Sequence, residues 1–319
     1  MSLRFTIGIP AYKSEFLYDC ISSILNQSFR EFELIIVNDC SPHPVEEIVE
    51  QFDDPRIRYF KNEQNIGAEN VVHNFNKCLE KAEGEFFVLM GDDDTMEPNY
   101  LFSFSELILK YPDLDVFHCR SLIIDGDSRP TILTPSWPEY ETVYETIWYR
   151  LNGNRVQFIA DFVFRSSRLK ENGGFYFIPM AWGTDDISVY ITMGKKGIAH
   201  INKPLLNYRL HASNITSSGS SALKMKAILQ QRQWLNNFLL DEPESRDDRI
   251  TYWNIRKNLD RLIKRQKITL IASSLKFPFF RSAIKWILIR KRFNVSFLDI
   301  LYAMVFYFRV KRVERYNQS

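Results

Sequence analysis

Three consecutive carboxylates, Asp92, Asp93 and Asp94, follow directly on the apolar run 86–90. A short apolar run bounded by glycines is typical of a strand that is buried on both faces. Adjacent acids in contact raise one another's pKa, so such a cluster holds either a proton or a cation. Mg²⁺ and Mn²⁺ prefer oxygen ligands and often bind together with phosphates. The triplet therefore indicates a divalent metal site, with a solvated acidic turn as the alternative.

Polar residues also follow two other predicted strands. The strand 5–9 is followed by Pro10-Ala11-Tyr12, and the strand 33–37 is followed by Asn38-Asp39. In sheets built from alternating strands and helices, ligands bind outside the carboxyl ends of the strands. We therefore expect Tyr12, Asp39 and the acidic triplet to share one edge of a sheet, and this favours a metal and phosphate site over an incidental turn.

The elements needed to position these residues alternate along the chain. Apolar periodicity predicts helices over 17–25, 44–52, 67–82 and 98–111, with further strands over 56–60 and 116–124. This alternation predicts an α/β fold with a mostly parallel, doubly wound sheet. No Gly-x-Gly-x-x-Gly or Gly-x-x-x-x-Gly-Lys-Ser/Thr motif occurs, which disfavours the usual dinucleotide-binding and P-loop chemistries.

Composition is that of a soluble protein, and the charge is unevenly distributed. The 319 residues are 45% hydrophobic, and length alone suggests roughly two domains. The four cysteines have no short paired spacing, so we expect free thiols in the cytoplasm and no zinc site. From Arg249 onward there are 17 Lys and Arg against 3 Asp and Glu, whereas the preceding part has 24 against 36. The basic tail predicts an anionic partner.

The tail, residues 221–319, is predicted to be purely helical, with helices over 223–240, 252–275, 280–291 and 295–310. The last apolar stretch is too short to span a bilayer, which takes roughly 20 apolar residues. Basic amphipathic helices favour peripheral attachment to the inner face of the cell membrane. The alternatives are packing on the preceding part of the chain or on a second subunit in a homodimer. Nucleic acid is disfavoured, because no recognisable binding fold accompanies the charge.

Residues 4 to about 212 resemble an inverting family 2 glycosyltransferase with the GT-A nucleotide-sugar-binding fold. Five motifs occur in the family's order: Ile9-Pro10-Ala11-Tyr12; the block from Asn26-Gln27-Ser28 to Asn38-Asp39; Asn62 with Asn65-Ile66-Gly67; Asp92-Asp93-Asp94; and Thr184-Asp185-Asp186 followed by Gly194-Lys195-Lys196-Gly197. The resemblance implies a catalytic domain over 1–220, with a donor half to about 125 and an acceptor half over about 126–220.

The resemblance also implies roles for individual residues. The acidic triplet matches the family's DxD element, with Asp93 as a ligand of Mn²⁺ or Mg²⁺ and Asp92 at the ribose or the metal. The segment 205–211 resembles the family's closing strand, which implies Arg209 near the diphosphate and His211 as a metal ligand or phosphate donor. The residues implied in donor binding are Pro10, Tyr12, Asp39, Asn65, Gly67, Asn70, Asp92 and Arg209.

Two further expectations concern specificity and catalysis. A carboxylate at Asp39 matches a base edge that carries a donor, such as uracil N3–H, and therefore favours uracil or thymine. A UDP-sugar is the expected donor. Asp186 is the expected general base, with Asp185 as the alternative. Both acids open a predicted helix, where they could instead stabilise its N-terminus.

The predicted function is metal-dependent, inverting transfer of a hexosyl or N-acetylhexosaminyl group from a nucleotide sugar. The acceptor would be a glycan or a lipid-linked glycan in the synthesis of a surface polysaccharide. The alternatives are a nucleotidyltransferase and a non-catalytic nucleotide- or glycan-binding module of an assembly complex.

Overall fold

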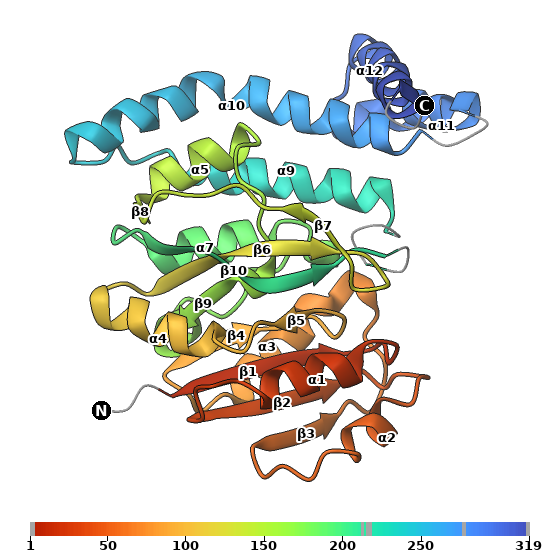
Figure 1. Ribbon diagram of the computed structural model, residues 1–319. Coiled ribbons are helices and arrows are strands. Elements are labelled where there is room, and N and C mark those ends of the chain that lie inside the picture. The colour runs from red at the N-terminus through yellow and green to blue at the C-terminus, as the bar shows by residue number, and fades with distance from the viewer. Residues whose placement is uncertain (1–3, 212–213, 215–218, 276–278, 317–319) are drawn as a thin grey trace. The chain divides into compact units, whose positions relative to one another are not determined.

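The computed structural model describes residues 4–211, 214, 219–275 and 279–316, and these form two compact units, Met1–Ser218 and Gly219–Ser319 (Figure 1). The strands of the first unit are β1 (Phe5–Ala11), β2 (Phe32–Asn38), β3 (Ile57–Lys61), β4 (Phe86–Leu89), β5 (Thr95–Met96), β6 (Val116–Ile124), β7 (Pro130–Leu133), β8 (Tyr140–Glu141), β9 (Phe162–Arg165) and β10 (Ile198–Arg209). Its helices are α1 (Leu17–Leu25), α2 (Val45–Val49), α3 (Val71–Lys81), α4 (Tyr100–Lys110), α5 (Val143–Leu151), α6 (Ser166–Glu171) and α7 (Thr184–Met193).

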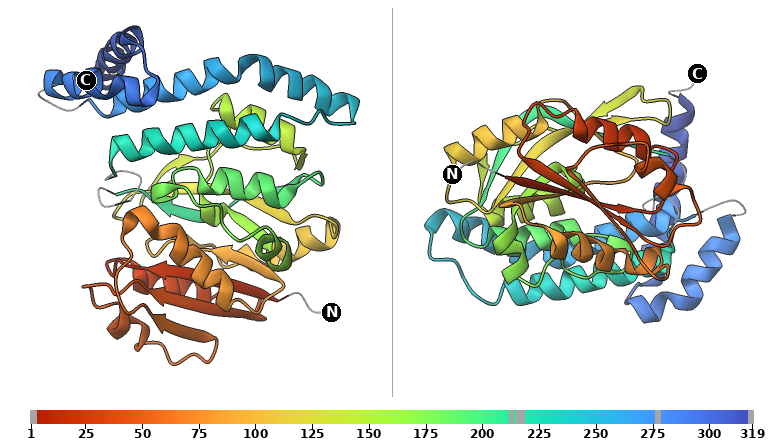
Figure 2. Two further views of the ribbon diagram at one scale, coloured as in Figure 1. Left: turned by 180° about the vertical axis from the view of Figure 1, so that it is seen from behind. Right: turned by 90° about the horizontal axis from the view of Figure 1, so that it is seen from below.

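The strands form one twisted sheet in the order β3-β2-β1-β4-β9-β6-β10-β5, with β7 beside β6 and β8 beside β10. The pairs β1–β2, β1–β4, β2–β3 and β6–β10 are parallel. The strand β9 runs antiparallel between β4 and β6. The two views show α1 and α4 on one face of the sheet and α3, α6 and α7 on the other (Figures 1 and 2). The expected α/β fold with a mostly parallel sheet is confirmed.

Burial on both faces explains the apolar sequence of the central strands. All seven residues of β2 and all four residues of β4 are buried, so alternation of polar and apolar residues would be unfavourable there. Gly8 in β1 permits close packing of α3, because a Cβ atom at this position would lie 2.7 Å from the Cβ of Cys78. The core therefore runs through the sheet and fixes the positions of the strand ends.

Two predicted helices have different lengths from those expected. The helix predicted over 44–52 is α2, which spans only Val45–Val49. The region predicted as one helix over 67–82 begins with the short 3₁₀ turn Ala68–Asn70 and continues as α3. Gly67 precedes that turn with φ of +78°, a conformation that glycine adopts at no steric cost.

The second unit consists of α9 (Ser221–Phe238), α10 (Arg246–Ser273), α11 (Phe279–Ile289) and α12 (Phe297–Tyr316). The helix α10 begins six residues before the expected start, because Ser245 caps it and Asp247 and Asp248 lie in its first turn. Lys267 of α10 donates to the carbonyl of Phe293 at 3.0 Å and so ties α10 to the turn before α12. Among the described helices, none combines the length and apolar content needed to cross a membrane.

Candidate active site

The candidate site lies at the edge of the sheet where β1, β2, β4, β6 and β10 end. These strands all point the same way, because β9 reverses the direction twice between β4 and β6. The chain leaves β1 toward β2 on one side and returns through β4 on the other, so the gap between β1 and β4 is the topological switch point. Ligands bind at this position in open α/β sheets. The expected clustering of strand-end polar residues is therefore present.

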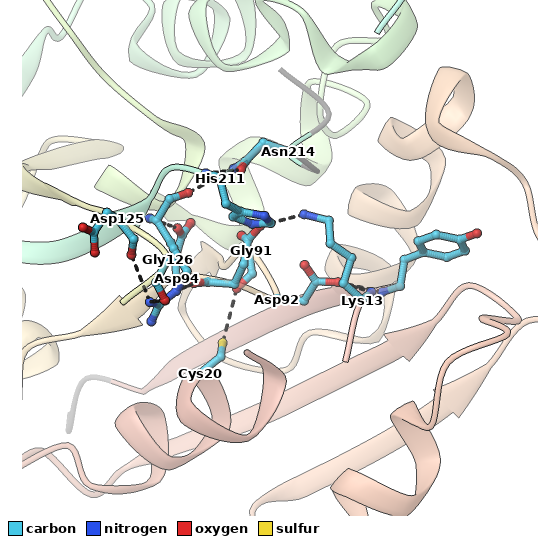
Figure 3. A network of polar contacts seen from close by, with 12 residues as sticks. Lys13, Cys20, Gly91, Asp92, Asp94, Asp125, Gly126, His211 and Asn214 are labelled. Atoms are coloured by element: carbon cyan, nitrogen blue, oxygen red, sulfur yellow. Dashed lines mark hydrogen bonds and ion pairs between the residues drawn. The ribbon is translucent and has the colours of Figure 1, made fainter. Parts of the chain in front are cut away.

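Asp92 joins the ends of β4 and β1. Its Oδ2 atom accepts hydrogen bonds from the backbone N–H groups of Tyr12 at 2.8 Å and Lys13 at 2.7 Å (Figure 3). Burial, together with the charge of Asp93, raises the pKa of Asp92 to about 6, although Lys13 and the two N–H groups oppose that shift. Asp92 thus fixes the turn after β1 across the switch point.

Asp93 lies between two nitrogen groups that come from segments far apart in the sequence. Its Oδ2 atom is 2.7 Å from Lys13 Nζ and 2.8 Å from His211 Nε2. The side chain of Asp93 is 9% exposed, and those of Lys13 and His211 are 21% and 11% exposed. One carboxylate oxygen therefore receives two nitrogen groups at a site that water reaches only partly.

Asp94 and Arg209 connect β4 to β10. Asp94 Oδ1 accepts from the backbone N–H of Arg209 at 2.8 Å, and Arg209 Nε donates to the carbonyl oxygen of Asp93 at 2.9 Å. Burial and the charge of Asp93 raise the pKa of Asp94 well above its ordinary value. Gly91 leaves room for this arrangement, because a Cβ atom there would lie 2.8 Å from Asp94 Oδ2.

The guanidinium of Arg209 points into the loop after β6. It donates to Ser128 Oγ at 2.8 Å and lies 4.2 Å from the ring centre of Phe16. Arg209 is only 1% exposed, so its described contacts are to the protein. The structure gives Arg209 a supporting position behind Asp93, and its contact with the diphosphate stays a prediction.

Asp39 follows β2 at the same edge and is held by the segment between β3 and α3. Its Oδ1 atom accepts from Asn62 Nδ2 at 2.8 Å and from the backbone N–H of Ile66 at 3.1 Å. Asn65 Nδ2 donates to the backbone carbonyl of Asp39 at 2.9 Å. Within the described part of the chain no donor reaches Oδ2 of Asp39. The carboxylate is therefore fixed through one oxygen and available through the other.

The other predicted donor-binding residues lie around Asp39. Pro10 is in β1 beside Val37, and Tyr12 directly follows β1 with 41% of its surface exposed. Gly67 begins the 3₁₀ turn, and Asn70 at the end of that turn donates to the carbonyl of Ile66 at 2.9 Å. The structure places these residues at the described edge, and their contact with a donor stays a prediction.

Asp185 and Asp186 form a second acidic group, in the first turn of α7. Asp186 Oδ1 accepts from Arg150 Nε at 2.7 Å and from Gln157 Nε2 at 2.9 Å. No hydrogen bond to Oδ2 of Asp186 occurs among the described residues. Burial and the charge of Asp186 raise the pKa of Asp185 to about 7. The capping box of Thr142 and Glu145 fixes the start of α5, which carries Arg150.

Asp161 lies in the short turn before β9 and interacts electrostatically with Asp94 and with Arg150. Its charge contributes to the raised pKa of Asp94, and the charge of Arg150 acts on Asp161 in turn. Asp161 is fully buried, and burial raises its own pKa to about 8 even though Ser121 and the backbone of Phe158 donate to it.

Sequence reasoning missed three residues that contact the predicted acids. Lys13 follows Tyr12 directly and is the cation nearest to Asp93, so its proximity to a motif residue was a usable signal. Arg150 and Gln157 come from the region 126–180, which shows no motif, and only the fold brings them to Asp186.

The donor groups around Asp93 suit a divalent cation that also binds phosphate. No three His, Cys, Asp or Glu side chains of the described residues are grouped so that they could hold a metal by themselves. Mg²⁺ and Mn²⁺ are commonly bound by one or two protein ligands together with water and substrate phosphates. Asp93 and His211 supply a carboxylate and an imidazole, and the ammonium of Lys13 shows that this position attracts a cation.

Comparison with known proteins gives one family match and several relatives. A family model described as Glycosyl transferase family 2 matches residues 6–169. TuaG of Bacillus subtilis, named as a teichuronic acid biosynthesis glycosyltransferase, is 27% identical over 67% of this chain and 82% of its own length. WcaA of Escherichia coli, named as a colanic acid biosynthesis glycosyl transferase, is 38% identical over 47% of this chain and 55% of its own length.

Solved structures share the fold. Staphylococcus aureus TarS in complex with UDP-GlcNAc is similar with a TM-score of 0.59 and 17% identity, over 97% of this chain and 92% of the other. The mannosyltransferase PcManGT from Pyrobaculum calidifontis, in complex with GDP-Man and Mn²⁺, gives a TM-score of 0.54 and 16% identity over 96% and 87% of the two chains.

Proposed function

The chain belongs to glycosyl transferase family 2, and on that premise we propose that it transfers a sugar from a UDP-sugar to a glycan or lipid-linked acceptor with the help of Mn²⁺ or Mg²⁺. Family membership makes the protein a glycosyltransferase and disfavours the nucleotidyltransferase alternative. The observation that carries the finer proposal is the position of Asp93 at the switch point, between His211 and Lys13.

Asp39 supports a uracil nucleotide in the proposed donor site. Its Oδ1 atom is already fixed by Asn62 and Ile66, so Oδ2 remains to accept from the N3–H of a uracil ring. The TarS structure contains UDP-GlcNAc, which is consistent with a UDP-linked hexose or N-acetylhexosamine here. In this proposal Pro10 and Tyr12 lie beside the base, and Asn65, Gly67 and Asn70 shape the loop that holds Asp39.

The leaving diphosphate requires neutralisation in the transition state. A divalent cation held by Asp93 and His211, with Asp92 beside it, would supply Lewis-acid stabilisation of that charge. A cation at Asp93 would displace Lys13 or share the oxygen with it, and a displaced ammonium would be available to a phosphate oxygen. Arg209 keeps the backbone at Asp93 in place through its bonds to Asp93 and Asp94.

Asp186 is the proposed general base for the acceptor hydroxyl. Arg150 and Gln157 both bind Oδ1, which orients the carboxylate and leaves Oδ2 to take a proton. Asp185 is the second candidate, because a pKa of about 7 suits a base at neutral pH. Attack by one deprotonated hydroxyl needs no covalent enzyme nucleophile, so a single displacement inverts the anomeric centre.

The proposed setting is the synthesis of a surface polysaccharide at the inner face of the cell membrane. This part rests on the names of TuaG and WcaA and on the basic helices of the second unit. We also propose that residues 1–220 divide into a donor half to about 125, which contains Asp39, and an acceptor half over about 126–220, which contains Asp186.

A calorimetric titration with UDP and with UDP-sugars, in the presence and absence of Mn²⁺, tests the proposal. We expect UDP to bind with Mn²⁺ and much more weakly in the presence of a chelator. Equal UDP binding under the two conditions would contradict the metal site, and preference for GDP over UDP would contradict the assignment of Asp39.

A further inference from the structure

The outward face of α11 combines basic and apolar side chains in regular order. Arg281, Ile284, Lys285 and Leu288 lie at spacings of three and four residues, so they share one side of the helix, and all four are exposed. Ile284 is 55% exposed and Leu288 is 77% exposed. The first unit has few apolar side chains this exposed, so this face calls for an explanation.

The opposite side of α11 is fixed against the rest of the second unit. Trp286 is 4% exposed, and its Nε1 atom donates to Ser274 Oγ at 2.8 Å, just after the end of α10. The Trp286 ring also makes an edge contact with Phe293 at 6.2 Å between ring centres. The orientation of α11 is therefore set by packing, and Ile284 and Leu288 point outward as a consequence.

The neighbouring helix α12 also has exposed apolar side chains on one face. Leu298, Leu301, Tyr302 and Val305 have the same spacing and are 62%, 41%, 62% and 51% exposed. The figures show α11 and α12 together at the carboxyl end of α10 (Figure 1). Of 25 large hydrophobic side chains exposed in the described chain, ten lie between residues 280 and 308, so the exposure is concentrated here.

The region 281–308 is predominantly basic. Residues 281–308 contain five Lys and Arg and a single acid, Asp299. That acid is buried and forms an ion pair with Lys264 of α10 at 2.9 Å, so it does not offset the outward charges. Among described residues no acid pairs with Arg281, Lys285, Lys291 or Arg292. The basic side chains are therefore available to an anionic partner.

We propose that these two helix faces dock the enzyme on an anionic lipid surface, with α11 lying in the plane of the interface. Apolar side chains would enter the boundary of the acyl chains while Arg281, Lys285 and Arg292 contact lipid phosphates. A second copy of the chain fits less well, because a symmetric contact would bring the basic side chains of both copies together without acids to neutralise them. This placement rests on the membrane setting proposed above and names the surface that would make the contact, and it does not depend on the transfer reaction.

Vesicle flotation of the full chain tests the docking surface. We expect binding to vesicles of equal parts phosphatidylglycerol and phosphatidylcholine, and none to pure phosphatidylcholine. The variant Arg281→Gln/Lys285→Gln should bind about 25-fold more weakly, at about fivefold for each basic side chain. The variant Ile284→Ser/Leu288→Ser should bind roughly tenfold more weakly, because the apolar contacts are lost.

Two controls match these changes within the same unit. Leu240, which is 76% exposed, and Lys257, which is exposed on α10, lie outside the two faces, so Leu240→Ser and Lys257→Gln should bind like the unaltered protein. Thermal unfolding of all variants should be similar, since every altered side chain is exposed. Undiminished vesicle binding by both double variants would overturn the proposal. A vesicle-independent dimer that Ile284→Ser/Leu288→Ser converts to a monomer would also overturn it, in favour of a second copy.

Discussion

Lys13 Nζ and His211 Nε2 both contact the same oxygen of Asp93, at 2.7 and 2.8 Å. Lys13 follows β1 and His211 follows β10, so residues nearly two hundred positions apart in sequence meet at one carboxylate oxygen. Figure 3 shows the side chains of Lys13 and His211 close to each other. A positive side chain occupies the position that a divalent cation would need. Any cation that binds Asp93 must therefore displace Lys13 or share the oxygen with it.

Replacing Lys13 should strengthen the binding of metal alone. Lys13→Met removes the competing ammonium at similar size, and we expect Mn²⁺ to bind about fivefold more tightly without nucleotide, the value of roughly 1 kcal/mol for one partly exposed ion pair. Lys13→Arg, which keeps the charge, should show no such gain. Electron paramagnetic resonance of free Mn²⁺ measures this directly, and equal affinities for Lys13→Met and the unaltered protein would show that Lys13 does not compete.

Replacing Asp93 should abolish metal-dependent nucleotide binding. Asp93→Asn keeps the shape of the side chain but removes the charge that attracts a divalent cation. We expect calorimetry to detect UDP binding with Mn²⁺ in the unaltered protein and a loss of at least tenfold in the variant. Asp127→Asn is a matched control, because Asp127 is an exposed acid paired only with Arg129 in the described structure. Retention of Mn²⁺-dependent UDP binding by Asp93→Asn would move the metal to another residue.

The sequence predicted the strand ends well because local pattern and topology agree there. The buried runs of β2 and β4 are too apolar for surface strands, and a parallel sheet places their carboxyl ends at one edge. The sequence alone was therefore enough to predict that Asp39 and Asp92 lie at the same edge of the sheet. Their individual partners could not be predicted. Asn62 reaches Asp39 through its side-chain conformation, and Tyr12 and Lys13 reach Asp92 through backbone N–H groups of a turn, and no periodicity encodes either feature.

The surroundings of Asp186 show the limit of such reasoning. Arg150 lies at the end of α5 and Gln157 lies in the irregular segment before β9, and both donate to Oδ1 of Asp186. Irregular segments have no hydrophobic repeat, so their path depends on the surfaces they cross. The choice between Asp185 and Asp186 depends on these contacts and was open from sequence alone.

Substituting each of the two acids of α7 in turn should show which of them is the general base. Asp186→Asn should lower turnover by roughly 10²–10⁴-fold, the usual worth of general-base catalysis, while UDP binding stays within about twofold. If Asp185 is the base, Asp185→Asn carries the large loss instead. A base with a pKa of about 7 would then make the rate of the unaltered enzyme fall as the pH drops through 7, because the base must be unprotonated. Full turnover by both variants would place the base elsewhere.

A buried histidine should make the stability of the first unit fall in acid. His200 lies in β10, 3% exposed, with its Nδ1 atom 2.6 Å from Nδ1 of His118 in β6. Burial and then the neighbouring His118 lower the pKa of His200 from 6.5 to about 2. Below pH 6.5 the unfolded chain binds a proton at His200 that the folded chain does not bind. The free energy of unfolding should therefore decrease by up to about 1.4 kcal/mol per pH unit for this residue.

Denaturant unfolding between pH 6 and pH 4 measures this effect. The free energy of unfolding should change less with pH in His200→Gln than in the unaltered protein, even if that variant is less stable overall. His43→Gln, which alters an exposed histidine, should keep the original slope. An unchanged slope in His200→Gln would mean that the folded protein protonates His200 as readily as the unfolded chain does.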